Sequence, residues 1–117
     1  MEGFGCHFLF DGIIKDISFV TQERVKDFLN KCPDEIGMTK ITPPVVYEAG
    51  GKIIGMVVIA ESHISFHGDL YSGKISIDVF SCMCFNYNDT LLFVKKQFPC
   101  KKHQTNFLER GLEFVRT

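Results

Sequence analysis

The side chains best suited to chemistry lie in two short segments of this sequence. Residues 60–67 read Ala-Glu-Ser-His-Ile-Ser-Phe-His, and residues 78–84 read Asp-Val-Phe-Ser-Cys-Met-Cys. Ser62 and Cys82 are side chains of the types that act as nucleophiles, for which a nearby histidine is a usual base. Histidine and cysteine are also preferred ligands of zinc. These residue types therefore indicate one of two kinds of site: a nucleophile with a histidine base, or a metal centre.

A metal centre would use His63, His67, Cys82 and Cys84. Zinc ligands all lie about 2.0–2.3 Å from one ion. On a strand, His63 and His67 are roughly 13 Å apart, and the two cysteines are about 6.6 Å apart. Only a bend in each strand would bring the four side chains together, so no metal is expected.

Nucleophilic catalysis has the right residue types but no surrounding signature. Neither Ser62 nor Cys82 lies in a nucleophile elbow or beside a glycine-rich oxyanion turn. A structural alternative is that these histidines and cysteines belong to a small core rich in phenylalanine, of which the chain has 12. The residues alone leave both interpretations open.

Strands are expected to position these segments. Residues 62–67 and 75–80 alternate apolar and polar side chains, which is typical of half-buried strands. The continuous apolar run 53–60 predicts a strand covered on both faces. Pro43-Pro44 confines a further strand, 41–47, to a sheet edge or a strand start. Short strands are also predicted at 6–10 and 104–108.

Two amphipathic helices complete the pattern. Thr21 is a suitable N-cap for a helix over residues 22–32, which Pro33 ends. Asn88 or Asp89 is expected to cap a second helix. Strands outnumber helices, and short turns join many of them. The sequence therefore predicts an α+β fold, a two-layer sandwich in which a mainly antiparallel sheet has two helices packed on one face.

Length and composition exclude several classes of protein. The chain has 117 residues, 45% hydrophobic and 23% charged, which fits a single domain over 1–117 and excludes a disordered tail or a coiled coil. A formal net charge of −1 gives no field that attracts nucleic acid or an anionic membrane. The lysines around Phe98 are interpreted as favourable cations at a helix C-terminus, with a nucleic-acid patch as the alternative.

The compartment is inferred from the cysteines and the apolar runs. Five cysteines, without zinc-ribbon or CxxC spacing, indicate reduced thiols in a cytoplasmic protein. The longest apolar run, Met56 to Ala60, is far shorter than the roughly 20 residues that span a bilayer. The first twelve residues lack the basic start of a signal peptide. No membrane partner is expected.

The two chemical segments also resemble those of a known family. Val-Val-Ile-Ala-Glu-Ser-His-Ile-Ser-Phe-His at 57–67, followed by Asp-Val-Phe-Ser-Cys at 78–82, closely resembles the self-processing core of prokaryotic S-adenosylmethionine decarboxylases. Gly-Cys-His-Phe at 5–8, Gly-Met-Thr at 37–39 and Leu-Glu-Arg-Gly at 108–111 resemble other segments of that family in the expected order. The resemblance therefore spans nearly the whole chain.

The resemblance implies that the chain cuts itself between residues 61 and 62. Ser62 Oγ would attack the carbonyl of Glu61 and convert the peptide bond to an ester through an oxyoxazolidine intermediate, with His67 as acid or base. β-Elimination would then leave a pyruvoyl group in place of Ser62, and this group would be the cofactor. Its carbonyl forms a Schiff base with a substrate amine and accepts the electrons released with carbon dioxide. Cys82 matches the family's proton donor.

The implied function is decarboxylation of S-adenosylmethionine, a small-molecule substrate, for the biosynthesis of the polyamine spermidine. The resemblance also implies a homodimer whose sites take residues from both subunits. Phe10 and Asp11 match the family's substrate-side strand.

Three positions depart from the family pattern. Ile54 stands where a serine usually assists processing, and Glu48, beside Tyr47, stands by count where an aromatic side chain stacks on adenine. The loop 68–71 differs from the usual Thr-Trp/Phe-Pro-Glu. Glu48 favours, as an alternative substrate, a basic amino acid such as ornithine or arginine. Ile54 and the loop favour a second alternative, an unprocessed homologue without catalysis.

Overall fold

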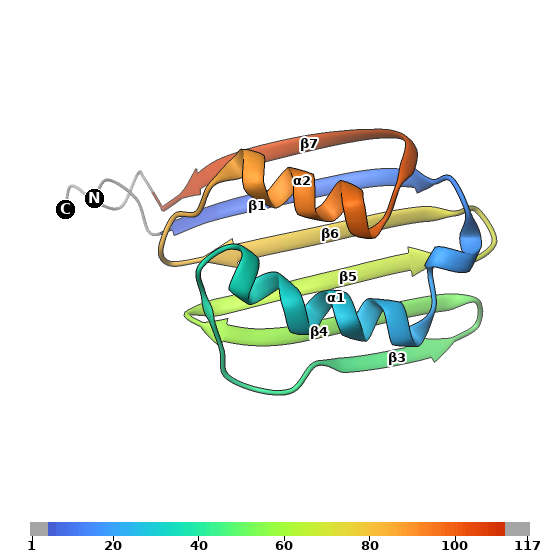
Figure 1. Ribbon diagram of the computed structural model, residues 1–117, viewed down its shortest axis with the longest axis horizontal. Helices are drawn as coiled ribbons and strands as arrows, with labels where there is room; N and C mark the ends of the chain where they lie inside the picture. Colours follow the sequence, from blue (N-terminus) through green and yellow to red (C-terminus); the bar gives the residue numbers. More distant parts are fainter. Residues whose placement is uncertain (1–4, 112–117) are drawn as a thin grey trace.

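The computed structural model describes residues 5–111, which contain a single antiparallel sheet of seven strands. The strands are β1 (Gly5–Ile14), β2 (Thr39–Lys40), β3 (Val45–Ala49), β4 (Lys52–Ala60), β5 (Ser62–Asp69), β6 (Lys74–Ser81) and β7 (Cys100–Arg110). Their order is β2-β4-β5-β6-β1-β7, and β3 also pairs with β4. The first and last strands of the chain thus lie side by side (Figure 1).

Two helices cover one face of this sheet. Helix α1 (Gln22–Glu35) lies over the β3–β5 half, and α2 (Tyr87–Gln97) lies over the half that contains β1 and β7 (Figure 1). A short 3-10 helix, η1 (Ile17–Phe19), leads from β1 into α1. The predicted α+β sandwich with both helices on one side is therefore confirmed.

Aromatic side chains fill the layer between the sheet and the helices. Phe28 of α1 packs against Phe93 of α2 and against Phe98, with ring centroids 5.7 and 5.3 Å apart. Phe66 of β5 packs on Phe98 at 4.9 Å. Burial of each such side chain contributes about 1.5–3 kcal/mol to folding. This core holds the strands in the register on which the site depends.

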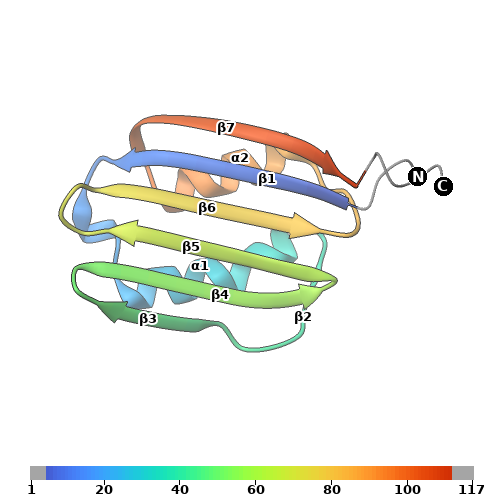
Figure 2. The ribbon, with the colours of Figure 1, turned by 180° about the vertical axis from the view of Figure 1, so that it is seen from behind.

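The opposite face of the sheet, which we call the open face, carries no helix from residues 5–111 (Figure 2). Ile54, Met56 and Val58 of β4 lie on it with 42, 48 and 39% of their surface exposed. The prediction that the run 53–60 is covered on both faces is therefore wrong for a single chain. Both helices pack on the side of Ile53, Val57 and Ile59, which leaves the alternate side chains in solvent.

Several element boundaries differ from the sequence predictions. Helix α1 continues through Pro33 to Glu35, although Pro33 has no N–H to donate to the carbonyl oxygen of Leu29 one turn earlier. Asn86 caps α2, in place of the expected Asn88 or Asp89, since its Oδ1 accepts the Asp89 N–H at 2.9 Å. The predicted strand 41–47 begins only after the two prolines, as β3.

Cys6 and Cys84 are joined by a disulfide, with their Cα atoms 5.0 Å apart. The expectation of reduced thiols is therefore wrong for this pair, whereas Cys32, Cys82 and Cys100 are free. The two residues are 78 positions apart in the sequence, so no local spacing pointed to them. Within residues 5–111, no helix is both long and apolar enough to cross a membrane.

Candidate active site

The Glu61–Ser62 bond lies at the tip of the hairpin between β4 and β5. Ile59 pairs with Ser62, so Ala60 and Glu61 form a two-residue turn. Ser62 has a φ of 137°, a value that residues with a side chain rarely adopt. Such a conformation costs on the order of 1–3 kcal/mol and persists only where the surroundings impose it. The strained residue in this hairpin is thus the serine singled out by the sequence.

Two groups contact the atoms of this bond. The Cys82 backbone N–H donates a hydrogen bond to the backbone carbonyl oxygen of Glu61 at 3.1 Å. The Ser62 Oγ lies 3.3 Å from His63 Nδ1. A nucleophile, a base and a donor to the carbonyl oxygen are therefore assembled within one chain, which is the arrangement that acyl transfer requires.

The Cys82 side chain lies beside the same turn. Burial and the Glu61 carboxylate, with which the thiol shares a hydrogen bond, raise the pKa of the Cys82 thiol. A thiol of raised pKa stays protonated at neutral pH, so it is able to give up a proton but is a poor nucleophile. The geometry therefore suits Cys82 as a proton donor.

His67 lies on β5 five residues beyond Ser62, which is roughly 16 Å along a strand. It is exposed on the open face, between Ile54 of β4 and Ser76 of β6. The structure brings Glu61, Ser62 and Cys82 together but does not bring His67 to them. Within one chain, His67 therefore cannot touch the Glu61–Ser62 bond.

Register across the strands arranges the open face in two rows. The His63 row, near the Glu61–Ser62 bond, consists of Val58, His63, Phe80, His7 and Leu108. The His67 row, at the other end of these strands, consists of Ile54, His67, Ser76, Asp11 and Gln104.

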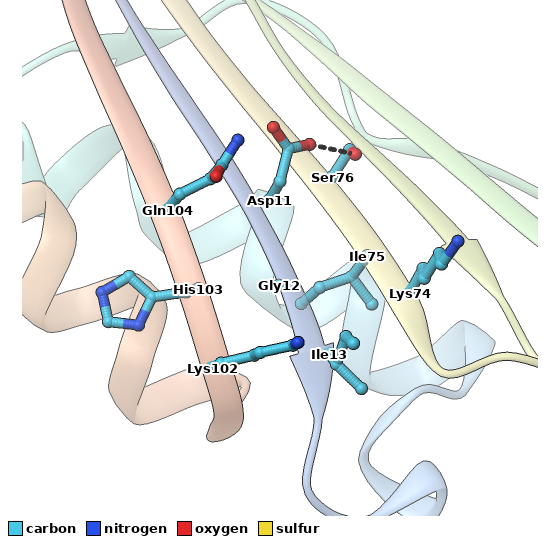
Figure 3. A pocket seen from close by; sticks show the side chains of 9 residues that line it. All are labelled: Asp11, Gly12, Ile13, Lys74, Ile75, Ser76, Lys102, His103 and Gln104. Atoms are coloured by element: carbon cyan, nitrogen blue, oxygen red, sulfur yellow. Dashed lines mark hydrogen bonds between the residues drawn. The ribbon is translucent and has the colours of Figure 1, made fainter.

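A hollow follows the His67 row. A pocket of about 340 Å³ lies over β1, β6 and β7, and Figure 3 shows Asp11, Ser76, Lys74 and Gln104 around it. Asp11 accepts a hydrogen bond from the Ser76 hydroxyl at 2.6 Å. A second pocket of about 240 Å³ contains His67 and shares Lys74 and Ser76 with the first. The sheet is thus hollowed beside His67, at the end opposite Ser62.

A polar cluster beside the His63 row was missed by sequence reasoning. Arg110 Nη1 donates to His7 Nδ1 at 2.9 Å, so the His7 proton lies on Nε2, 3.8 Å from Asp78 Oδ2. Burial lowers the pKa of His7, although the charge of Asp78 opposes this shift. The Arg110 guanidinium also lies 5.0 Å from the centre of the Phe80 ring. No sequence signal identifies this cluster, because its members meet only through strand register.

Comparison with known proteins then identifies the family. The family model described as S-adenosylmethionine decarboxylase matches residues 13–111. The chain belongs to the S-adenosylmethionine decarboxylase family. It is therefore an adenosylmethionine decarboxylase-like carboxy-lyase. Comparison with curated proteins gave no match.

The fold of this S-adenosylmethionine decarboxylase family member is also found among solved structures. A similar structure is the crystal structure of the adenosylmethionine decarboxylase from Aquifex aeolicus, with a TM-score of 0.80 and 24% sequence identity. The match covers 95% of this chain and 93% of that chain. At this identity the similarity establishes the arrangement of sheet and helices.

Two residues that the family resemblance assigned to substrate are not on the open face. Phe10 is fully buried on the helix side of β1, where it stacks on His103 at 5.3 Å. Glu48 accepts a hydrogen bond from Gln22 of α1 at 3.0 Å, so it faces the helix. Its neighbour Tyr47 pairs with Ile54 instead and is 65% exposed. The aromatic side chain beside the His67 row is therefore Tyr47.

Among residues 5–111 there is no group of three or more His, Cys, Asp or Glu side chains placed to hold a metal ion.

Proposed function

We propose that this chain is a pyruvoyl-dependent decarboxylase of S-adenosylmethionine, which makes its cofactor from Ser62 and serves spermidine biosynthesis. One observation carries the proposal: the Glu61–Ser62 bond lies in a tight turn with the Cys82 N–H on its carbonyl oxygen and His63 Nδ1 at the serine hydroxyl. Attack of Ser62 Oγ on this carbonyl needs both groups, because negative charge develops on the oxygen as the hydroxyl loses its proton.

The residues around the turn fit a pyruvoyl group at position 62. That group supplies an electrophilic carbonyl, which takes the substrate amine and accepts the electrons released with carbon dioxide. The Cys82 thiol, kept protonated beside Glu61, holds the proton that the substrate carbon needs after decarboxylation. Glu61 is exposed, so the turn is open to solvent.

The proposal is tested by the intact mass of the purified chain under denaturing, reducing conditions. Cleavage yields fragments of 61 and 56 residues, since the break follows Glu61 in a chain of 117. The second fragment lacks a free amine. The Ser62→Ala variant, which has no hydroxyl, is the matched control and stays intact.

A wild-type chain that remains intact on prolonged incubation would instead favour the unprocessed homologue. Ile54 pairs directly with His67. A serine at position 54, as the family usually has, would therefore lie beside His67. If Ile54→Ser then restores cleavage, the isoleucine is the cause.

Tyr47 supports S-adenosylmethionine over a basic amino acid as the substrate. Its exposed ring beside the His67 row is suited to stacking on adenine, whereas Glu48 points toward α1. Stacking of a base on an aromatic side chain is worth about 1–3 kcal/mol. We therefore expect Tyr47→Ala to raise the KM for S-adenosylmethionine roughly tenfold, by loss of one such contact.

Glu48→Ala is the matched control for this measurement, and its KM should stay near that of the wild type. A raised KM in Glu48→Ala with an unchanged KM in Tyr47→Ala, together with release of carbon dioxide from ornithine or arginine, would support a basic amino acid as the substrate. Carbon dioxide release from each of the three substrates separates the two cases.

A homodimer follows from the position of His67, which the resemblance places in self-processing. His67 lies roughly 16 Å along β5 from its own Ser62. The open face also exposes Ile54, Met56 and Val58, an apolar strip suited to contact with a second copy. In the proposed dimer, the His67 row of one protomer meets the Glu61–Ser62 turn of its partner. Asp11 and Ser76 then line the shared substrate pocket.

A further inference from the structure

We infer that His63 is the base that activates Ser62, so that the first step of self-cleavage is completed within a single protomer. The inference rests on the proposed function and adds to it a catalytic residue that the family resemblance did not assign. The resemblance named only His67 as acid or base.

The contact between Ser62 and His63 depends on the unusual backbone of the turn. In a regular strand, neighbouring side chains point to opposite faces of the sheet. Ser62 departs from the strand conformation with a φ of 137°, and its Oγ lies 3.3 Å from the Nδ1 of the next residue. The strained backbone of Ser62 thus occurs together with a contact between its hydroxyl and an imidazole nitrogen, which a regular strand would not allow.

Neighbouring side chains hold the His63 ring in place. Phe80 of β6 packs edge-on against it, with the ring centroids 6.0 Å apart. Phe80 also packs against His7, at 5.5 Å, and lies under the Arg110 guanidinium. Packed side chains thus connect Arg110 of β7, through Phe80, to the His63 ring beside the Ser62 hydroxyl.

The proposed step moves one proton and exchanges one bond. The proton of Ser62 Oγ passes to His63 Nδ1 while Oγ attacks the Glu61 carbonyl carbon. The carbonyl oxygen becomes negatively charged and keeps the hydrogen bond from the Cys82 N–H. The carbon–nitrogen bond then breaks, and the nitrogen of Ser62 takes the proton back from His63. The product is an ester between Glu61 and Ser62 Oγ with a free amine, and no other reactant is consumed.

The second step, β-elimination from this ester, needs a base at the Ser62 Cα proton. In the proposed dimer, His67 of the partner protomer provides it. His63 and His67 therefore act on successive steps, and their variants should stop at different chemical species.

Hydroxylamine distinguishes these species, because it cleaves esters and leaves peptide bonds intact. We expect His63→Ala to slow cleavage by a factor of roughly 10²–10⁴, the usual contribution of a general base, and to accumulate a chain resistant to hydroxylamine. We expect His67→Ala to accumulate an uncleaved chain that hydroxylamine splits between residues 61 and 62. Intact mass after each treatment is the readout.

Two controls separate loss of the base from loss of the fold. Added imidazole should speed the cleavage of His63→Ala, because it replaces the missing base in a correctly folded turn. Lys96→Ala removes an exposed side chain of α2, which lies on the helix side of the sheet, and should cleave at the wild-type rate.

The possible results distinguish failure of the role of His63 from failure of the proposed function. Cleavage of His63→Ala at the wild-type rate, or a hydroxylamine-sensitive ester in that variant, overturns the role of His63 and leaves the decarboxylase proposal standing. A wild-type chain that never cleaves but is split by hydroxylamine supports the first step and contradicts the pyruvoyl enzyme. A wild-type chain that resists both contradicts both proposals.

Discussion

At the scale of single residues, the environment of Cys82 decides its chemistry. A cysteine near a catalytic serine is a candidate nucleophile, and the sequence left that interpretation open. The structure places its thiol against the Glu61 carboxylate, and burial together with that negative charge raises the pKa of the thiol. The thiolate is disfavoured, so the residue is suited to hold a proton.

This raised pKa predicts slow alkylation of Cys82. In the folded Ser62→Ala chain, iodoacetamide should modify Cys82 with a pH midpoint above the value of about 8.5 for an ordinary thiol. Adding Glu61→Gln should lower the midpoint, because one source of negative charge is removed. Peptide mapping by mass spectrometry separates Cys82 from Cys32, whose pKa burial raises to about 12. An unchanged midpoint in the glutamine variant would show that Glu61 does not act on the thiol.

The same shift has a defined effect on stability. The folded chain holds the Cys82 proton more tightly than the unfolded chain, so the stabilisation is present at neutral pH. It is lost as the pH rises through the thiol pKa of the unfolded chain and then through that of the folded chain.

At the scale of elements, the disulfide anchors the segment that carries Cys82. Cys84 lies in the connection between β6 and α2, and its bond to Cys6 ties this connection to the start of β1. The Cys82 N–H that contacts Glu61 comes from the same connection. The disulfide therefore restrains the backbone that holds the donor in place.

This link predicts a stability difference that depends on reductant. A Cys6→Ser/Cys84→Ser chain should be less stable than the oxidised wild type by about 2–4 kcal/mol, because its unfolded state is less constrained. Urea unfolding followed by circular dichroism measures the difference. With dithiothreitol present, the two chains should converge. Equal stabilities without reductant would show that the bond does not restrain the folded chain in solution.

At the scale of the whole molecule, the open face of the sheet leaves apolar side chains of β4 exposed. Its apolar run 53–60 is typical of a strand covered on both faces, yet the helices cover only one. A second copy against the open face would cover the other. The same contact would bring His67, with its hollow, to the partner's Ser62.

Complementation between two inactive chains tests this arrangement. Ser62→Ala lacks the nucleophile and His67→Ala lacks the partner base, so each chain alone should stay uncleaved. When the two are co-expressed, the mixed dimer places an intact His67 opposite an intact Ser62. We expect the His67→Ala chain to be cleaved in up to about half of the molecules, as random pairing requires. Absence of any cleavage in a mixed dimer verified by sedimentation would place His67 in its own subunit's site.

Much of this protein follows from local sequence patterns. Alternating and apolar runs located the main strands, the spacing of apolar residues after Thr21 located α1, and the Glu-Ser-His-(x)3-His motif indicated the family. Such patterns are readable because they repeat within a few residues. Glu61, Ser62 and Cys82 were therefore singled out together from the sequence alone.

Only the tertiary structure decided which of these residues meet. Strand register places the Cys82 N–H on the Glu61 carbonyl, separates His67 from Ser62, and joins Cys6 to Cys84. It also turns Tyr47 to the open face and Glu48 to α1, a distinction of one residue that reverses which of the two side chains lies on the open face. These relations depend on pairing between distant segments, and no local pattern in one chain specifies that pairing.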